Sequence, residues 1–126
     1  MKKDIEHIDD IKLLVDSFYK KVIVVETIGY FFTKVIQFDW QVHLPVMYSF
    51  WDTILFGTMS YKGNPMVKHI EMNKKESLKK EHFDQWMKLW KETIDELFIG
   101  EKANEAKKRA GSIAQLMQYK IQNTIV

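Results

Sequence analysis

The last third of the chain contains two long stretches in which apolar residues recur every three or four positions. That spacing places their side chains on one face of an α-helix, whereas a half-buried strand alternates apolar and polar residues. One stretch spans residues 83–98 and the other 103–121, and Gly100 separates them. The pattern predicts two long amphipathic helices. The second is rich in alanine in its front half, so another helix can approach it closely.

A third stripe lies near the N-terminus and predicts a helix that Gly29 ends. It consists of Ile11, Leu14, Val15, Phe18 and Val22. Asp9 or Asp10 can cap this helix and place negative charge at its start. The β-branched run 22–25 has no partner strand elsewhere in the sequence, so it does not predict a sheet. An aromatic-rich turn or short helix follows at residues 30–36.

A further helix is predicted from about Val42 to Phe56, with Gly57 as its end. Pro45 is expected in its first turn, because a proline ring deeper in a helix clashes with the preceding turn. One face of this helix is apolar apart from a histidine. It carries His43, Met47, Phe50, Trp51 and Ile54. Together the segments predict an all-α fold of about five helices of unequal length.

Length and composition limit what the chain can be. Its 126 residues suffice for one domain with a core, residues 1–126, and not for two. Arg109 is the only arginine, which argues against nucleic acid, since base and phosphate recognition favours arginine. There is no cysteine, which excludes a disulfide or a thiolate ligand. No leader or membrane-spanning run is recognisable, so we expect a soluble, cytoplasmic protein that does not bind membranes.

The stretch from Tyr61 to Ile70 joins a loop to a short predicted helix that carries a histidine. Asn64 and Pro65 suit the cap and first position of that helix. Met66 and His69 then share a face, so the histidine points inward beside an apolar side chain. Such a histidine is either a core residue or a metal ligand.

Several inward-facing residues together favour the ligand interpretation. His43 and His69 lie on predicted inward faces, as do Tyr19 and Trp86 on two other helices. No carboxylate shares those faces, which argues against a di-iron bundle, and zinc would need more ligands than two histidines. Iron in a porphyrin needs only one protein ligand. The residues therefore point to haem, while a set of purely structural core residues stays open.

The segments that carry these residues resemble the third group of truncated haemoglobins. The matching segments, in order along nearly the whole chain, are Phe18-Tyr19, Trp40-Gln41-Val42-His43-Leu44-Pro45, Phe50-Trp51, Leu55-Phe56-Gly57, Tyr61-Lys62-Gly63-Asn64-Pro65-Met66, His69, His82-Phe83, Trp86, Thr93-Ile94-Asp95-Glu96-Leu97-Phe98 and Lys107-Lys108-Arg109-Ala110. The resemblance implies a shortened globin in which two antiparallel helix pairs enclose haem b, iron protoporphyrin IX.

Position by position, the resemblance also implies roles for single residues. His69 matches the histidine that binds the iron, and Met66 lies beside it. Tyr19 and Trp86 match residues that face the ligand on the other side of the haem. His43 matches the residue at the gate to that side, Met47 matches the apolar residue above the haem, and Phe32 matches the phenylalanine that wedges the haem. Tyr61 either meets a haem propionate or closes its loop.

The resemblance implies dioxygen, nitric oxide or a similar small molecule as the ligand, with a reductase as a partner. Chemistry on oxygen, nitric oxide or peroxide, as in a nitric oxide dioxygenase or a peroxidase, stays open. So do two other classes, a small all-α interaction module without cofactor and a haem-based sensor subunit. Lys79 stands where relatives have a capping threonine, so that helix is expected to start elsewhere or fray. His82 is assigned no role beyond the surface, and residues 107–109 a solvated helix face or a contact with a redox partner.

Overall fold

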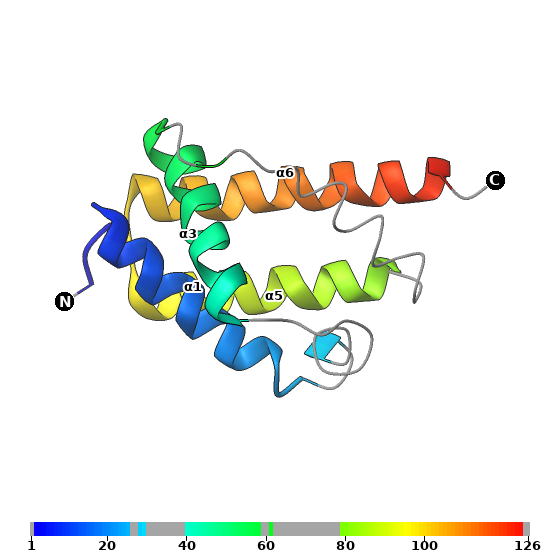
Figure 1. Cartoon of the computed structure of the whole chain (residues 1–126), viewed down its shortest axis with the longest axis horizontal. Helices are drawn as coiled ribbons and strands as arrows, with labels where there is room; N and C mark the ends of the chain where they lie inside the picture. Colours follow the sequence, from blue (N-terminus) through cyan, green and yellow to red (C-terminus); the bar gives the residue numbers. More distant parts are fainter. Residues whose placement is uncertain (1, 26–27, 30–39, 59–60, 62–78, 125–126) are drawn as a thin grey trace.

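The computed structural model describes residues 2–25, 28, 29, 40–58, 61 and 79–124. Within these ranges the chain forms four helices, which confirms the predicted all-α fold. They are α1 (Ile8–Val22), α3 (Trp40–Phe56), α5 (Lys80–Leu97) and α6 (Glu101–Thr124). Helices α5 and α6 run side by side in opposite directions, and α1 and α3 cross one end of this pair (Figure 1). The result is two helix pairs packed on each other.

Helix α1 buries the whole predicted stripe, Ile11, Leu14, Val15, Phe18 and Val22. Its start differs from the prediction, because His7 is the N-cap residue and Asp10 lies in the first turn. Asp10 nevertheless acts as a cap, since its Oδ2 accepts the backbone N–H of Glu6 at 2.9 Å. The same oxygen accepts the backbone N–H of the N-cap residue His7 at 3.4 Å, so this carboxylate satisfies backbone donors just before the helix.

The predicted end of this helix at Gly29 is wrong. Helix α1 stops at Val22, seven residues earlier, where the β-branched run begins and helix propensity falls. Gly29 serves a different purpose, because a Cβ there would lie 2.8 Å from the carbonyl oxygens of both Val22 and Ile23. Glycine therefore lets the chain pass close to the end of α1.

Helix α3 ends at Phe56 as predicted, and Gly57 follows with a φ of 68°. The prediction that Pro45 lies in the first turn is wrong, because α3 begins at Trp40 and Pro45 is inside it. The ring removes one hydrogen bond, the one to the carbonyl of Gln41. Gln41 is exposed, so water can reach that end of the helix.

Helices α5 and α6 pack through the predicted faces. The α6 side of this contact is formed by Ala103, Ala106, Ala110, Ala114, Met117 and Ile121, all buried. Beyond the crossing with α1 and α3, the two long helices continue as a pair (Figure 1). There Phe83 packs with Ala114, Met117 and Ile121 in a cluster of its own.

The start of α5 lies at Lys80, directly after Lys79, so the lack of a capping threonine does not move it. His82 replaces the missing cap. Its Nδ1 accepts the backbone N–H of Lys79 at 2.8 Å. This is the half of a capping box in which a side chain in the first turn reaches back to the residue before the helix. His82 therefore has a structural role that the sequence did not reveal.

Two side-chain contacts hold α3 against its neighbours, one to α1 and one to α6. The hydroxyl of Tyr48 on α3 donates a hydrogen bond to Asp16 on α1. Burial and this carboxylate raise the pKa of Tyr48 to about 12, so the hydroxyl remains a donor at neutral pH. From α6, the Nζ of Lys102 donates to the carbonyl of Leu55 at 2.6 Å, which places a cation at the C-terminal end of α3.

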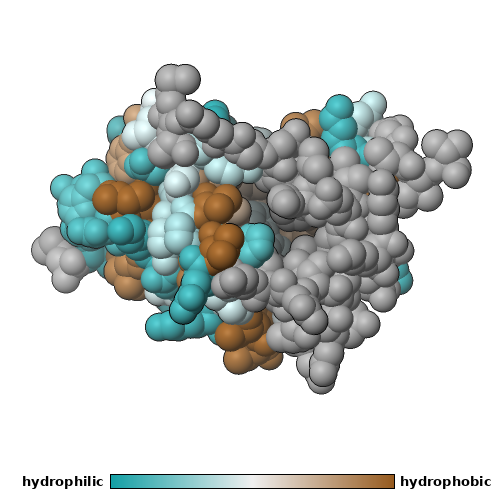
Figure 2. Space-filling view, viewed as in Figure 1, coloured by the Kyte–Doolittle hydropathy of each residue, from teal (hydrophilic) through white to brown (hydrophobic). Residues whose placement is uncertain are grey.

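Figure 2 shows apolar surface in the region of α3. Among the residues of that helix, Val42 and Val46 are exposed. They lie one turn apart, opposite the buried Trp51 and Leu55. No helix in the described part of the chain is long and apolar enough to cross a membrane.

Candidate haem and ligand site

Phe18 on α1 is the centre of an aromatic cluster that joins three helices. Its ring meets the rings of Tyr19, Trp86 and Trp90 edge to face, with centroids 5.0, 5.5 and 5.0 Å away. Such edge-to-face pairs are favourable geometries for aromatic rings. Tyr19 and Trp86, which were predicted to share the ligand's side of the haem, therefore contact the same side chain.

Three tryptophans continue this cluster toward α3. The rings of Trp86 and Trp90 are stacked with centroids 6.0 Å apart and planes 4° from parallel. Trp51 stacks on the other side of Trp90 at 4.6 Å. The indole N–H of Trp90 donates to the carbonyl of Ala106 at 3.1 Å, which satisfies its polar atom inside the core. Trp90 is thus a buried core residue held by ring contacts and a hydrogen bond. Trp86, in contrast, is half-buried.

Tyr19 stands at the edge of the α1 stripe, as the sequence predicted, and also packs against Trp40 with ring centroids 5.4 Å apart. This contact joins the C-terminal part of α1 to the start of α3. Burial raises the pKa of the Tyr19 hydroxyl far above its usual range. A phenol in this environment stays protonated at neutral pH and can donate a hydrogen bond.

The residues predicted on the inward face of α3 lie beside the most deeply buried ones. Trp51 and Leu55 are buried, whereas His43, Met47, Phe50 and Ile54 are half-buried. These four side chains lie within a 60° sector of the helix surface, and that sector is next to the one that carries Trp51 and Leu55. His43 and Met47 are one turn apart on this side, so they share a face as predicted.

Tyr61 packs on this same side of α3. Its ring meets Phe50 edge to face at 5.2 Å, and its backbone N–H donates to the Oγ1 of Thr53 at 3.1 Å. Burial raises the pKa of Tyr61 above its usual value. These contacts hold Tyr61 against α3, and both roles expected for this tyrosine stay predictions.

Phe32, Met66 and His69, and the short helix expected around them, lie outside the described residues. Among the residues that are described, no three His, Asp or Glu side chains come together as a metal site. Trp40 was named only as part of a matching segment, and Phe18 only as part of the α1 stripe and of the pair Phe18-Tyr19. Phe18 is the hub of the cluster, and the only sign of this is that it belongs to both the α1 stripe and the pair Phe18-Tyr19.

Two crossed helix pairs with this aromatic cluster between them form the two-over-two sandwich of a shortened globin. A comparison with models of protein families gives no match. The chain is 30% identical to the group 3 truncated haemoglobin ctb of Campylobacter jejuni, over 95% of this chain and 97% of that protein. It also resembles the crystal structure of a group III truncated haemoglobin from Campylobacter jejuni. That likeness has a TM-score of 0.83 and 28% identity, and covers 96% of this chain and 95% of that one.

The chain therefore belongs to the group 3 truncated haemoglobins. The predicted family and fold are confirmed, including the arrangement of the two helix pairs. Globins bind haem and small gaseous ligands, so membership implies a protein of that kind and not a cofactor-free interaction module.

Proposed function

We propose that this protein binds haem b through His69 and holds a diatomic ligand on the opposite side of the iron, where Tyr19, His43 and Trp86 lie. The observation that carries the proposal is the shared packing of Tyr19 and Trp86 on Phe18, which brings a buried phenol and a half-buried indole together. The 30% identity to a group 3 truncated haemoglobin along nearly the whole chain supports a globin of this kind.

The described residues fit a haem. A porphyrin is flat and mostly apolar, and α3 offers Met47, Phe50 and Ile54 on one half-buried side next to His43. Tyr61 packs against that side through Phe50. In the proposal Met47, Phe32 and Met66 contact the porphyrin, and Tyr61 lies at its edge near a propionate. When bound, the haem supplies an iron atom with one open position for the ligand.

The protein's own groups decide how firmly a ligand is held. A bound ligand with partial negative charge would accept a charge-assisted hydrogen bond from a phenol or indole that is shielded from water. Tyr19 is protonated at neutral pH and is therefore a donor. His43 lies in the first turns of α3, on the side next to the core, and acts as the gate. A polar pocket of this kind suits anionic ligands, so we extend the proposal to chemistry on oxygen, nitric oxide or peroxide with electrons from a reductase.

The visible absorption spectrum of the purified protein, with and without added haemin, tests the haem assignment. A Soret band is expected, and its absence after reconstitution would rule the proposal out. His69→Gly should abolish the native spectrum, because the iron loses its protein ligand, and added imidazole should partly restore it. The chain has four histidines, so His7→Gly, at the exposed start of α1, is the control and should leave the spectrum unchanged. An unchanged spectrum in His69→Gly would move the ligand to His43.

A further inference from the structure

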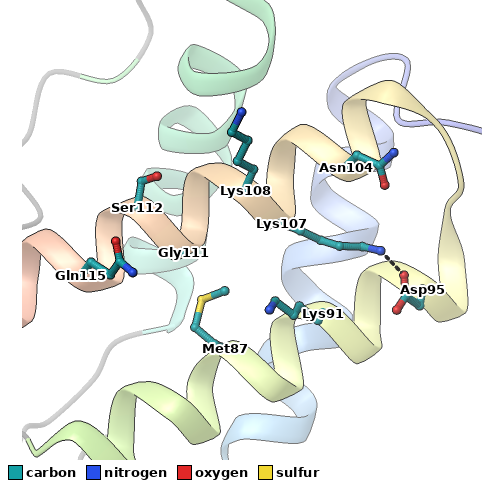
Figure 3. A pocket seen from close by; sticks show the side chains of 9 residues that line it. All are labelled: Met87, Lys91, Asp95, Asn104, Lys107, Lys108, Gly111, Ser112 and Gln115. Carbon is teal, nitrogen blue, oxygen red and sulfur yellow. Dashed lines mark hydrogen bonds and ion pairs between the residues drawn. The ribbon is translucent and has the colours of Figure 1, made fainter.

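Helices α5 and α6 enclose an open groove of about 560 Å³ on one side of their contact (Figure 3). Its floor is formed by Met87 on α5 and Gly111 on α6, where a Cβ on the glycine would lie 3.8 Å from the Met87 Cε. Three lysines also line the groove, Lys91 from α5 and Lys107 and Lys108 from α6. The groove is therefore apolar at the bottom and basic at its walls.

Among the described residues that line the groove, Asp95 is the only one with a carboxylate, and that carboxylate is already paired. Asp95 forms an ion pair with Lys107, which Figure 3 shows as a dashed line. Its backbone carbonyl accepts a hydrogen bond from the Nζ of Lys2 at 2.5 Å, which brings a further cation to this end of the groove. Lys91 and Lys108 form no ion pair with any described residue. The groove is thus lined by one lysine from each helix, Lys91 and Lys108, without an ion pair to any described residue.

The groove lies next to the aromatic cluster. Met87 and Lys91 follow Trp86 and Trp90 by one residue each, which is 100° round the helix. Because Trp86 and Trp90 stack within the cluster that contains Phe18, the groove and that cluster lie on adjacent sides of α5. A protein bound in the groove would therefore lie close to the proposed ligand pocket without entering it.

We propose that this groove is the docking surface for the acidic face of a protein that donates electrons. The inference rests on the proposed function, because haem iron must gain one electron from a donor before it binds dioxygen. The donor is oxidised by one electron, the iron is reduced by one, and no bond forms or breaks between the two proteins. A lysine ammonium group is a hydrated point charge on a flexible side chain. Lysines can therefore pair with carboxylates that are scattered over a protein surface. Phosphate recognition, in contrast, favours arginine forks.

The charge pattern also fits the kind of complex that electron transfer needs. Such encounters bury little surface and rely on electrostatic steering, which raises association rates and weakens with salt. Lys91 and Lys108 supply steering charge, and the open shape of the groove permits rapid release. An acidic partner would bind in competition with salt and not by deep burial.

The test uses the haem-loaded full chain and reduced flavodoxin, an acidic one-electron carrier, as the probe. Stopped-flow spectroscopy measures the second-order rate of haem reduction at low and high salt. The double variant Lys91→Glu and Lys108→Glu should slow reduction at least tenfold at low salt and flatten the salt dependence. The matched control, Lys20→Glu and Lys120→Glu, changes the net charge equally at exposed sites on α1 and α6 and should stay within about twofold of the unaltered protein.

A second readout does not depend on electron transfer. Amide chemical shifts of the ferric protein are followed as oxidised flavodoxin is added, and the shifts should cluster around Lys91 and Lys108. Dithionite should reduce all variants at the same rate, which shows that their haem sites are intact. Equal slowing by both double variants would overturn the docking surface, as would shifts there with inorganic phosphate and none with flavodoxin. A protein without a Soret band would instead count against the proposed function.

Discussion

The carboxylate of Asp4 accepts the backbone N–H of Ala103 at 2.8 Å, so the N-terminal segment caps a helix that begins almost a hundred residues later. The other oxygen of Asp4 accepts the N–H of Lys102 at 2.9 Å. Helix α6 begins after Gly100, which has no side chain with which to cap it. An acceptor from elsewhere in the chain therefore satisfies two of the donors that every helix start leaves unpaired.

This contact makes the stability depend on pH in a defined direction. Burial alone would raise the pKa of Asp4, but hydrogen bonds from Lys102, Ala103 and Ile5 outweigh it and hold that pKa below its usual value. A carboxyl group with a lowered pKa in the folded protein stabilises it above the unfolded-state value of about 4, and this stability is lost as pH falls through the folded-state value.

Asp4→Asn should remove this part of the pH dependence. An amide offers one acceptor oxygen where the carboxylate offers two, so we expect a loss of about 1 kcal/mol at pH 7. The difference from the unaltered protein should shrink as pH falls below about 4. Urea unfolding at several pH values measures it. Glu92→Gln, at an exposed carboxylate on α5, is the control. A constant difference at every pH would mean that Asp4 acts through shape alone.

Two glycines in or beside α6 should respond to alanine in opposite ways. Gly100 has a φ of 143°, and a Cβ there would lie 2.4 Å from the Cγ of Asp4. Gly100→Ala should therefore cost about 1–3 kcal/mol, through backbone strain and a displaced cap. In Gly111→Ala the new methyl group meets only Met87 at ordinary distance, and helix propensity favours alanine by up to about 1 kcal/mol. Thermal unfolding separates the two, and equal effects would contradict this explanation.

The amphipathic helices could be predicted because apolar residues at every third or fourth position fit one face of an α-helix and do not fit a strand. In α1 and α6 the buried apolar residues are those of the apolar stripes, so the sequence determines which face turns inward. In α5 the stripe residues Phe83, Trp90 and Ile94 are buried, but Leu89 and Thr93 beside the stripe are buried as well. The cap on α6 could not be predicted, because nothing near residue 100 indicates that Asp4 comes to lie there. The same applies to His82, whose capping role depends on where the helix begins.

Helix α3 shows why part of the site could not be oriented from sequence. It is apolar on nearly every side, with Trp51 and Leu55 buried and Val42 and Val46 exposed. A helix of this kind has no single preferred face, so periodicity could not separate the core side from the side that carries His43. The site residues were identified by their resemblance to a family, which fixes positions along the chain but not their contacts.

The two stacked tryptophans Trp86 and Trp90 should respond differently to substitution, because one belongs to the proposed site and the other to the core. Trp90→Phe removes a buried hydrogen bond to Ala106 and leaves a cavity, so we expect a loss of about 2 kcal/mol in stability. Trp86 is half-buried, and Trp86→Phe should cost about half as much while changing ligand release. Urea unfolding measures the first effect and flash photolysis the second. A larger stability loss in Trp86→Phe would make it the core residue of the pair.

Tyr19 offers the most direct test of the ligand pocket, because Tyr19→Phe removes one hydroxyl and keeps the contacts of the ring with Phe18 and Trp40. A hydrogen bond to a partly charged ligand contributes about 1.5–3 kcal/mol. Its loss should speed release of dioxygen by about ten- to a hundredfold. The rate is measured by mixing the oxygenated protein with a scavenger of free dioxygen.

The matched comparison is His43→Leu, which should alter the rate of ligand entry more than the rate of release, because His43 lies near the start of α3 and acts in the proposal as a gate. If Tyr19 and Trp86 hold the ligand in one network, the double variant should lose less than the sum of the two single losses. That outcome is expected because both rings rest on Phe18, so a change in one shifts the other. A sharp rise in the release rate of His43→Leu with none in Tyr19→Phe would make the histidine, and not the tyrosine, the residue that holds the ligand.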